Sequence, residues 1–254
     1  MLLKQCRLVI KKNGGRNNQG VITVRGKRKK KKHYYYKVNF CTKIFDIKNQ
    51  VKWVGKRRQR NSYLLLYKSG NSFFHYRIAP LNLKVRAETT SMFDDRPLIG
   101  NSMPLYSMPL VVDVHSVEMR KNQGAILSRA AGSSMRVLRK HSRVGYVTLK
   151  LPSKKINYVK WDCMSTVGQV SNENFFLKEI GKAGKAFHDG RRPQSRGVAM
   201  NPVDHPMGGG EGKSSGGRQS CSPWGWKTKG PKTRAKIKSK FLNKLKNKVN
   251  KFFD

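Results

Sequence analysis

Short runs of apolar, β-branched and aromatic residues recur along the first part of the chain, separated by glycine and polar residues. Runs of this kind favour β-strands, and Gly70 followed by Asn71 is typical of a hairpin turn. The predicted strands occupy residues 21–24, 34–40, 43–53, 62–67 and 73–79. Five short strands are the number that an OB-fold uses, so the pattern indicates a small β-barrel over residues 21–95.

A second group of strand-like runs follows residues 97–109, a segment rich in proline and methionine that we interpret as a linker. In residues 147–151 apolar and polar side chains alternate, which predicts one apolar face and one polar face. The predicted strands are residues 111–119, 126–130, 135–140, 145–151 and 155–163. Together they predict a second β domain over residues 97–175.

The pattern of regular elements thins after residue 172, and proline, glycine, serine, lysine and arginine dominate residues 176–240. A brief helix interrupted by two glycines is expected near residues 179–187. Almost nothing in this extended segment can form a core, so by itself its composition is typical of disorder. We expect it to become ordered by lying on RNA, whose phosphates replace the missing core.

The two ends of the chain differ in pattern. Residues 1–20 carry no long apolar pattern and predict an N-terminal extension. Residues 241–254 place apolar side chains at helical spacing with lysines opposite them, which predicts a C-terminal amphipathic helix. We expect that helix to dock on a neighbouring protein or on RNA, and a membrane surface is the alternative.

Charge narrows the choice of partner. The 254 residues carry a formal net charge of +42 at pH 7, and 37% of them are hydrophobic. Self-repulsion of that size disfavours a compact free protein, so we expect a polyanion to neutralise it. A membrane surface fits poorly because the basic residues spread along the whole chain, and no apolar run approaches the roughly 18 residues that span a bilayer. RNA or DNA is therefore expected, and composition does not choose between them.

The cysteines and histidines do not predict a metal site. No C-x-x-C pair occurs, which argues against a zinc ribbon or a dense disulfide framework and favours reduced thiols. The histidines lack ligand spacing such as H-x-x-x-H, and we interpret His115 as a hydrogen-bonded histidine of the barrel rather than a catalytic one. We predict no intrinsic cofactor, only Mg²⁺ ions that belong to a bound RNA.

Two basic clusters lie beside predicted strands. Residues 27–32 are lysine and arginine and are followed, after His33, by three tyrosines, which offers phosphate neutralisation beside aromatic faces. We favour RNA contact here over a merely solvated loop. Arg57, Arg58 and Arg60, before the fourth strand, are interpreted in the same way.

Residues 196–212 form the least regular stretch of the chain. Pro202 and Pro206 exclude a helix, and the glycines that follow favour no regular element. Successive glycines turn their N–H groups to one side, and such a concave set of amides binds anions such as phosphate. A nucleotide-binding P-loop is excluded, because Met207 stands where that motif needs its first glycine.

This stretch, Arg-Gly-Val-Ala-Met-Asn-Pro-Val-Asp-His-Pro-Met-Gly-Gly-Gly-Glu-Gly, resembles the signature of the universal large-subunit ribosomal protein L-two family. Residues 15–20, 181–184, 222–225 and 232–234 match further motifs in the order of the family. The resemblance covers roughly residues 13–236. It implies a mainly β fold, with an OB-fold barrel followed by an SH3-like barrel and with extended basic N- and C-terminal segments. The chain departs from the family at the basic run and at Met207, where many members carry a second histidine.

The resemblance implies a structural constituent of the large ribosomal subunit that binds large-subunit rRNA and supports subunit association and the peptidyl transferase region. Expected partners are the rRNA, neighbouring ribosomal proteins and a bridge contact to the small subunit, without a small-molecule substrate or a membrane span. We predict rRNA contacts at Arg16, Lys29, Lys30, Arg57, Arg58, Lys182, Lys185, Arg191, Arg192, Arg196, Asn201, Asp204, His205, Gly208, Gly209, Gly210, Lys213, Arg218, Trp224, Lys232 and Arg234. For Trp224 and Trp226, stacking on bases and packing on the loop are equal alternatives.

An enzymatic alternative centres on Asp204 and His205, with the aspartate orienting the histidine as a general base. Consecutive residues in a loop flanked by prolines are poorly placed to form that pair, and no nucleophile has a supporting motif nearby. We therefore predict that the protein is not an enzyme and that His205 makes a polar contact to rRNA.

The abundance of Lys, Asn, Tyr and Phe, the missing presequence and the divergent loops favour an organelle-encoded protein. We expect it in the mitochondrial ribosome, with a plastid or the bacterial cytoplasm as alternatives.

Overall fold

The computed structural model describes residues 6–10, 13–27, 33–41, 48–57, 59–70, 73–90, 96–212, 217–230 and 232. These residues fall into two compact units. The barrel unit comprises the described residues within 6–10 and 33–179, and the loop unit those within 13–27 and 180–232. Every strand of the described chain lies in the barrel unit.

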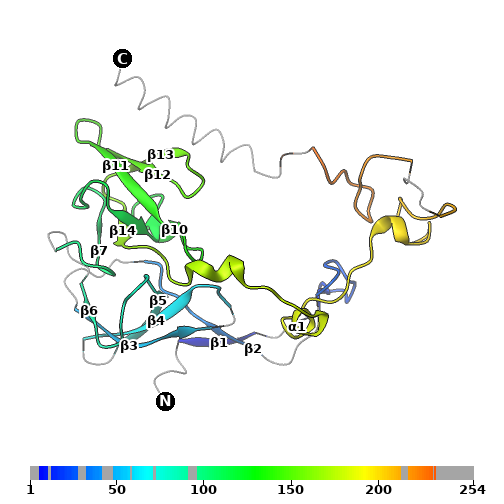
Figure 1. Cartoon of the computed structure of the whole chain (residues 1–254), viewed down its shortest axis with the longest axis horizontal. Coiled ribbons are helices and arrows are strands. Elements are labelled where there is room, and N and C mark those ends of the chain that lie inside the picture. Colours follow the sequence, from blue (N-terminus) through cyan, green and yellow to red (C-terminus); the bar gives the residue numbers. More distant parts are fainter. Residues whose placement is uncertain are drawn as a thin grey trace. The chain divides into compact units, whose positions relative to one another are not determined.

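The first barrel consists of a four-stranded sheet and a two-stranded ribbon. Its strands are β1 (Arg7–Ile10), β2 (His33–Tyr36), β3 (Asn49–Lys56), β4 (Tyr63–Ser69), β5 (Phe73–Ile78) and β6 (Glu88–Thr89). The sheet has the order β5-β4-β3-β6, and β1 pairs antiparallel with β2 (Figure 1). Beyond β2, the N–H of Asn39 donates to the carbonyl of Tyr76 at 2.7 Å. That hydrogen bond connects the segment after the ribbon to β5, so the ribbon and the sheet together form the first barrel.

The position of β4 between two buried clusters explains why its sequence is a continuous apolar run. Successive side chains of a strand point to opposite faces. Leu64 and Leu66 pack in one buried cluster with Tyr76, while Leu65 and Tyr67 pack in another. Both faces of β4 are therefore buried, and the predicted hairpin between β4 and β5 is confirmed by their antiparallel pairing.

The first strand of this barrel is β1, so the prediction of a strand at residues 21–24 is wrong. Val21, Ile22 and Val24 are 45–59% exposed and lie in the loop unit. β-branched residues stabilise a strand only where a partner strand and a buried face exist. Residues 7–10, which were predicted to be part of an extension, find that partner in β2.

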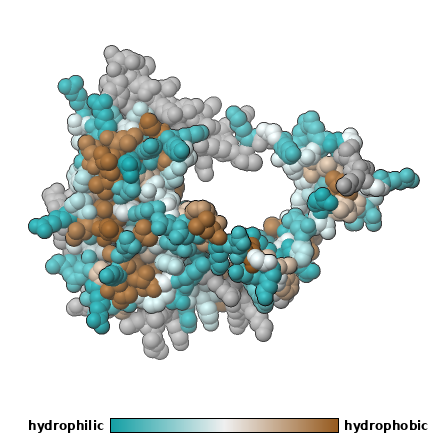
Figure 2. Space-filling view, viewed as in Figure 1, coloured by the Kyte–Doolittle hydropathy of each residue, from teal (hydrophilic) through white to brown (hydrophobic). Residues whose placement is uncertain are grey.

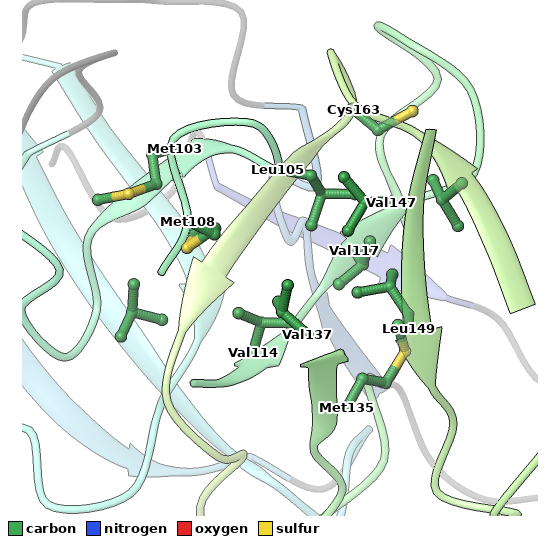
Figure 3. Packing of buried hydrophobic residues seen from close by; sticks show 12 residues of the cluster. Met103, Leu105, Met108, Val114, Val117, Met135, Val137, Val147, Leu149 and Cys163 are labelled. Carbon is green, nitrogen blue, oxygen red and sulfur yellow. The ribbon is translucent and has the colours of Figure 1, made fainter. Parts of the chain in front are cut away.

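The second barrel is built around a six-stranded sheet of order β13-β12-β11-β8-β14-β7, with a separate β9–β10 pair. Its strands are β7 (Ser102–Pro104), β8 (Asp113–His115), β9 (Val117–Glu118), β10 (Ala125–Leu127), β11 (Met135–His141), β12 (Tyr146–Lys150), β13 (Ile156–Lys160) and β14 (Met164–Val167). Val114, Val117, Val137 and Leu149 are fully buried in one cluster (Figure 3).

The interpretation of residues 97–109 as a linker is wrong. Pro104 belongs to β7, which pairs with β14 at the edge of the sheet, and an edge strand tolerates a residue without an N–H. Met103, Leu105 and Met108 are at most 1% exposed and fill the core of the second barrel (Figure 3). Flexible methionine side chains suit an irregular gap of this kind.

The two barrels are joined within the barrel unit by a short backbone pairing. The N–H of Leu81 donates to the carbonyl of Gln169 at 2.7 Å, and the N–H of Ser171 donates to Ala79 at 3.0 Å. The side chain of Val170 packs into the core of the first barrel. The predicted fold class, mainly β with an OB-fold barrel followed by an SH3-like barrel, is confirmed.

Helical structure is sparse. A 3-10 helix, η2 (Glu173–Leu177), follows the second barrel, and the loop unit contains α1 (Ala183–His188) and the 3-10 helix η3 (Gly197–Ala199). The brief helix expected near residues 179–187 is found as α1, which begins after Gly181 at a positive φ of 72°. The predicted C-terminal helix, residues 241–254, lies outside the described residues. In the described part of the chain, no helix has the length and apolar character to cross a membrane.

Candidate RNA-binding surface

Residues 13–24 of the loop unit form a closed loop held by polar contacts. The side-chain oxygen of Asn17 accepts two backbone N–H bonds of 3.0 Å each, and the carbonyl of Gly15 accepts two more at 3.0 and 3.1 Å. Gly15 has a φ of +83°, and a Cβ there would lie 2.2 Å from the carbonyl oxygen of Val24. Only glycine fits this turn, which leaves Arg16 exposed.

This loop pairs with the segment that follows α1. The N–H of Arg192 donates to the carbonyl of Gly26 at 2.9 Å, and Lys27 forms a bridge with Arg191. An open groove of about 910 Å³ runs along the junction. Its polar lining includes Arg16, Arg25, Lys27, Arg192, Asn201 and Asp204. With four cations beside one carboxylate, the lining of the groove is electrostatically suited to an anion.

The segment after η3 folds around His205. The side chain is 6% exposed, and its Nδ1 accepts the N–H of Met207 at 3.0 Å. The carbonyl of Asn201 accepts the N–H groups of Asp204 and His205 at 3.0 and 3.3 Å. Among the described residues no hydrogen bond or ion pair joins the Asp204 carboxylate to His205. The histidine therefore stabilises the loop from inside.

Three glycines are required by the close packing of this loop. A Cβ on Gly197 would lie 2.4 Å from the ring of His205, and one on Gly208 would lie 2.4 Å from the carbonyl oxygen of Asn201. One on Gly209 would lie 2.6 Å from a proline ring carbon. Side chains at these positions would force the loop open.

The expectation that the glycine amides form a concave anion site needs correction at two positions. The N–H of Gly208 donates to the carbonyl of His205 at 2.9 Å, and that of Gly209 donates to Met200 at 3.0 Å. These two amides are used within the loop. Gly210 is exposed at the end of the loop.

The outer surface of this loop carries the groups that a partner can reach. Arg196, Asn201 and Asp204 are exposed, as predicted contacts require. Val203 at the tip is 90% exposed. A loop with an apolar tip and polar neighbours suits contact with a second macromolecule.

A second turn, closed by hydrogen bonds, presents two tryptophans. The N–H of Ser222 donates to the carbonyl of Trp226 at 2.8 Å, and the Oγ of Ser222 accepts the N–H of Trp226 at 3.2 Å. Gly225 turns the chain with a φ of +83°. Trp224 is 60% exposed and Trp226 is 75% exposed. Both rings face solvent, which favours stacking on a partner over packing on the loop.

Most of the other predicted contacts within the described chain are also exposed. Hydrophilic residues dominate the visible surface of the loop unit (Figure 2). The exposed predicted contacts include Lys182, Lys185, Arg191, Arg192, Arg218 and Lys232. Lys29, Lys30, Arg58, Lys213 and Arg234 lie outside the described residues. Arg25 was missed, because nothing in the sequence shows that residues 21–27 line a groove.

Arg57 has a different environment. Its guanidinium lies 4.4 Å from the ring centroid of Tyr36 and 4.2 Å from that of Trp53, and its Nε is buried without a hydrogen-bond partner. Cation–π contacts on two rings fix this side chain to the first barrel. Arg57 therefore has a packing role that the sequence did not predict.

The buried histidines of the barrel unit are neutral structural groups. His115 is 1% exposed and hydrogen-bonds through Nδ1 to the carbonyl of Gly168 at 2.9 Å, which confirms its interpretation as a barrel histidine. Burial lowers its pKa to about 4, against the opposing effect of that hydrogen bond. Burial and then the charge of Arg77 lower the pKa of His75 to about 3. Neither is poised for acid–base chemistry near neutral pH.

Comparison with known families matches the chain in two parts. Residues 4–90 match the model of the family described as Ribosomal Proteins L2, RNA binding N-terminal domain. Residues 98–225 match Ribosomal Proteins L2, C-terminal domain.

Several similar proteins from bacteria carry the name large ribosomal subunit protein uL2. The protein of Acidiphilium cryptum is 39% identical over 95% of this chain and 87% of its own length. That of Amoebophilus asiaticus is 44% identical over 91% and 83%. That of Methylocella silvestris is 40% identical over 98% and 89%.

Proposed function

We propose that this chain, which belongs to the ribosomal protein L2 family, is a structural constituent of the large ribosomal subunit that binds and organises the large-subunit rRNA. Two β-barrels would dock on folded rRNA, and the loop unit would lie between rRNA helices. The work is electrostatic and geometric: phosphates are neutralised, and helices are fixed relative to one another.

The observation that carries this proposal is the loop unit. Residues 11–32 include ten lysines and arginines without an aspartate or glutamate. The described loops hold their shape through backbone hydrogen bonds and glycine contacts, and they expose arginines and two tryptophans. Cations for phosphates and aromatic faces for bases are the two features of RNA-binding surfaces.

We assign the rRNA contacts in three groups. The groove group contains Arg16 and Arg192, which line the groove, and Arg191, which forms a bridge with Lys27. The loop group contains Arg196, Asn201, Asp204, His205 and Gly208–Gly210, where the N–H groups of Gly208 and Gly209 are already bonded within the loop. The remaining predicted contacts are Lys29, Lys30, Arg57, Arg58, Lys182, Lys185, Lys213, Arg218, Trp224, Lys232 and Arg234. The arginines and lysines pair with phosphates, except Arg57, whose guanidinium packs on the rings of Tyr36 and Trp53. Asn201 hydrogen-bonds a base edge. Because the ring of His205 is buried, we assign its contact to the backbone around it rather than to catalysis.

The test is binding of the full chain to large-subunit rRNA as a function of salt. A protein that neutralises six to ten phosphates loses about 10³–10⁵ in affinity between 50 and 200 mM salt. We expect a loss in that range, together with tighter binding to large-subunit rRNA than to small-subunit rRNA of equal length. Affinity that hardly changed with salt, or that was equal for both RNAs, would contradict the proposal.

We also propose the finer roles that the family resemblance implies. These are support of subunit association, a bridge contact to the small subunit and support of the peptidyl transferase region, alongside contacts with neighbouring ribosomal proteins. Reconstitution of large subunits with and without the chain tests them, since subunits that lack it should associate poorly with small subunits. Normal association and peptide-bond formation without the chain would refute these roles.

For the compartment, we propose the mitochondrial ribosome, with a plastid or the bacterial cytoplasm as alternatives. The proposal is supported by the abundance of lysine, asparagine, tyrosine and phenylalanine, and by the basic run at residues 27–32 where the family is usually rich in glycine and histidine. Detection of the chain in ribosomes purified from mitochondria would support it. Detection only in plastid or bacterial ribosomes would refute it.

A further inference from the structure

Phe40 lies at the seam between the two barrels, and arginines from both barrels contact its ring. Phe40 follows β2 in the first barrel, and its carbonyl accepts the N–H of Ala125 in β10 of the second barrel at 2.9 Å. Gly124 packs closely there, because a Cβ on it would lie 3.4 Å from the Phe40 backbone. The segment around Phe40 is therefore fixed at the place where the barrels meet.

Two arginines from different barrels converge on this ring. The Cζ of Arg60, before β4, lies 4.9 Å from the Phe40 centroid, and the Cζ of Arg129, after β10, also lies 4.9 Å from it. Both side chains are half-buried. Arg129 is oriented further by an Nη1–H bond of 3.2 Å to the carbonyl of Ala125. Both guanidinium groups are thus held against the same ring, and the charge of Arg129 acts on Arg60.

The electrostatics of this pair are unfavourable without an anion. Burial and then the positive charge of Arg129 lower the pKa of Arg60. Tyr35 acts in the opposite direction, and no carboxylate of the described residues contributes to the shift. Like charges held together in a half-buried place destabilise each other, and a bound anion would reverse that effect.

We propose that Arg60 and Arg129 form a binding site for a single phosphate group at the seam of the two barrels. Planar guanidinium groups bind phosphate oxygens in pairs, and two of them converging from different directions select a tetrahedral anion. A phosphate held there ties the two barrels together. The RNA backbone is the source of this phosphate if the proposed function holds, and free inorganic phosphate offers the same chemistry.

A double-mutant cycle on the full chain tests the site. Affinity for a large-subunit rRNA transcript is measured for the unmodified protein, Arg60→Gln, Arg129→Gln and the double variant. Each single change should weaken binding about tenfold, because it removes charged hydrogen bonds. The double change should also cost about tenfold rather than a hundredfold, because either loss already disables a shared site. Arg60→Lys keeps the positive charge but loses the planar guanidinium that donates paired hydrogen bonds, so it should lose affinity several-fold.

Arg143→Gln is the matched control, since Arg143 is an exposed arginine of the second barrel. Near-UV circular dichroism of each variant establishes that the barrels are folded. Losses no larger than that of the control, or a hundredfold loss in the double variant, would overturn the shared site while leaving the rRNA-binding function standing.

The source of the phosphate is decided by thermal unfolding in sodium phosphate and in sodium chloride of equal ionic strength. Stabilisation by phosphate that Arg60→Gln abolishes and Arg143→Gln retains would show that free phosphate also binds. Coupling in the RNA cycle without such stabilisation would assign the site to the RNA backbone. If the protein does not bind rRNA, the proposed function fails, and the phosphate measurement alone decides this site: equal stabilisation of all variants would overturn it.

Discussion

The barrel unit and the loop unit are stabilised in different ways. The barrel unit contains three clusters of buried side chains, whereas His205 is the one buried side chain of the described loop unit. Brown, apolar residues gather over the barrels in Figure 2, and the surface of the loop unit is mainly hydrophilic. Apolar burial stabilises the barrels without a partner. The loop unit relies on backbone hydrogen bonds and glycine contacts, so we expect its order to depend on RNA.

The largest expected effect is in the barrel core. Leu149 is fully buried in the cluster of the second barrel, so Leu149→Ala should lower the free energy of unfolding by about 2–5 kcal/mol. Val203→Ala in the loop unit should change it by less than about 0.5 kcal/mol, because that side chain is 90% exposed. Urea unfolding followed by near-UV circular dichroism measures both. Equal losses of unfolding free energy in the two variants would show that apolar burial does not distinguish the barrel unit from the loop unit.

The sequence predicted the barrels well where a strand has a strong local pattern. The apolar run of β4 and the alternation in β12 identify strands without tertiary information. Prediction failed at residues 21–24, whose β-branched residues have no partner strand, and at residues 97–109, whose prolines and methionines belong to an edge strand and an irregular core. In both places the pairing partner decides the structure: β7 pairs with the distant strand β14, and residues 21–24 have no partner strand.

The next effect concerns pH and the barrel unit alone. Burial lowers the pKa of His115 to about 4 in the folded protein, below the ordinary value of 6.5. Between pH 4 and pH 6.5, His115 therefore binds a proton in the unfolded chain but not in the folded protein. The stabilisation is fully present above pH 6.5, and the free energy of unfolding falls as pH drops from 6.5 to 4, by on the order of 3 kcal/mol. His75 acts in the same direction.

Urea unfolding at a series of pH values checks this expectation. His115→Gln keeps a donor for the Gly168 carbonyl and should reduce the pH dependence. His188→Gln, at an exposed position in the loop unit, is the control and should leave it unchanged. A pH profile that stayed the same in both variants would show that His115 does not carry the effect.

A smaller effect should appear in RNA binding without a change in barrel stability. Gly197→Ala places a methyl group 2.4 Å from the His205 ring and should deform the loop at a cost of about 1–3 kcal/mol, or about fivefold to 150-fold in rRNA affinity. Gly184→Ala is the matched control, because nothing lies within 4 Å of its Cβ position in α1. Filter binding and urea unfolding measure the two properties. A loss of barrel stability in Gly197→Ala would contradict the separation of the units.

The candidate RNA-binding surface was predictable in composition but not in geometry. The sequence identifies the stretch 196–212 and the basic residues around it. It does not reveal that the amides of Gly208 and Gly209 are used internally, or that Arg57 is held between two rings. Arg60 and Arg129 are distant in sequence, and only the meeting of the barrels at Phe40 brings them together.

The smallest expected effect is the loss of one exposed ring. Trp226 is 75% exposed on a turn that backbone bonds hold, so Trp226→Ala should leave the unfolding free energy unchanged. Base stacking on an aromatic ring contributes about 1–3 kcal/mol, and we expect the low end, about fivefold in rRNA affinity, because Trp224 remains beside it. Trp226→Phe keeps an aromatic face and should retain most of the affinity. Because stacking does not neutralise a phosphate, the salt dependence of binding should be the same in both variants as in the unmodified protein. A reduced salt dependence in Trp226→Ala would instead show that the ring positions a cation at a phosphate, and an unchanged affinity would show that the ring makes no contact with a base.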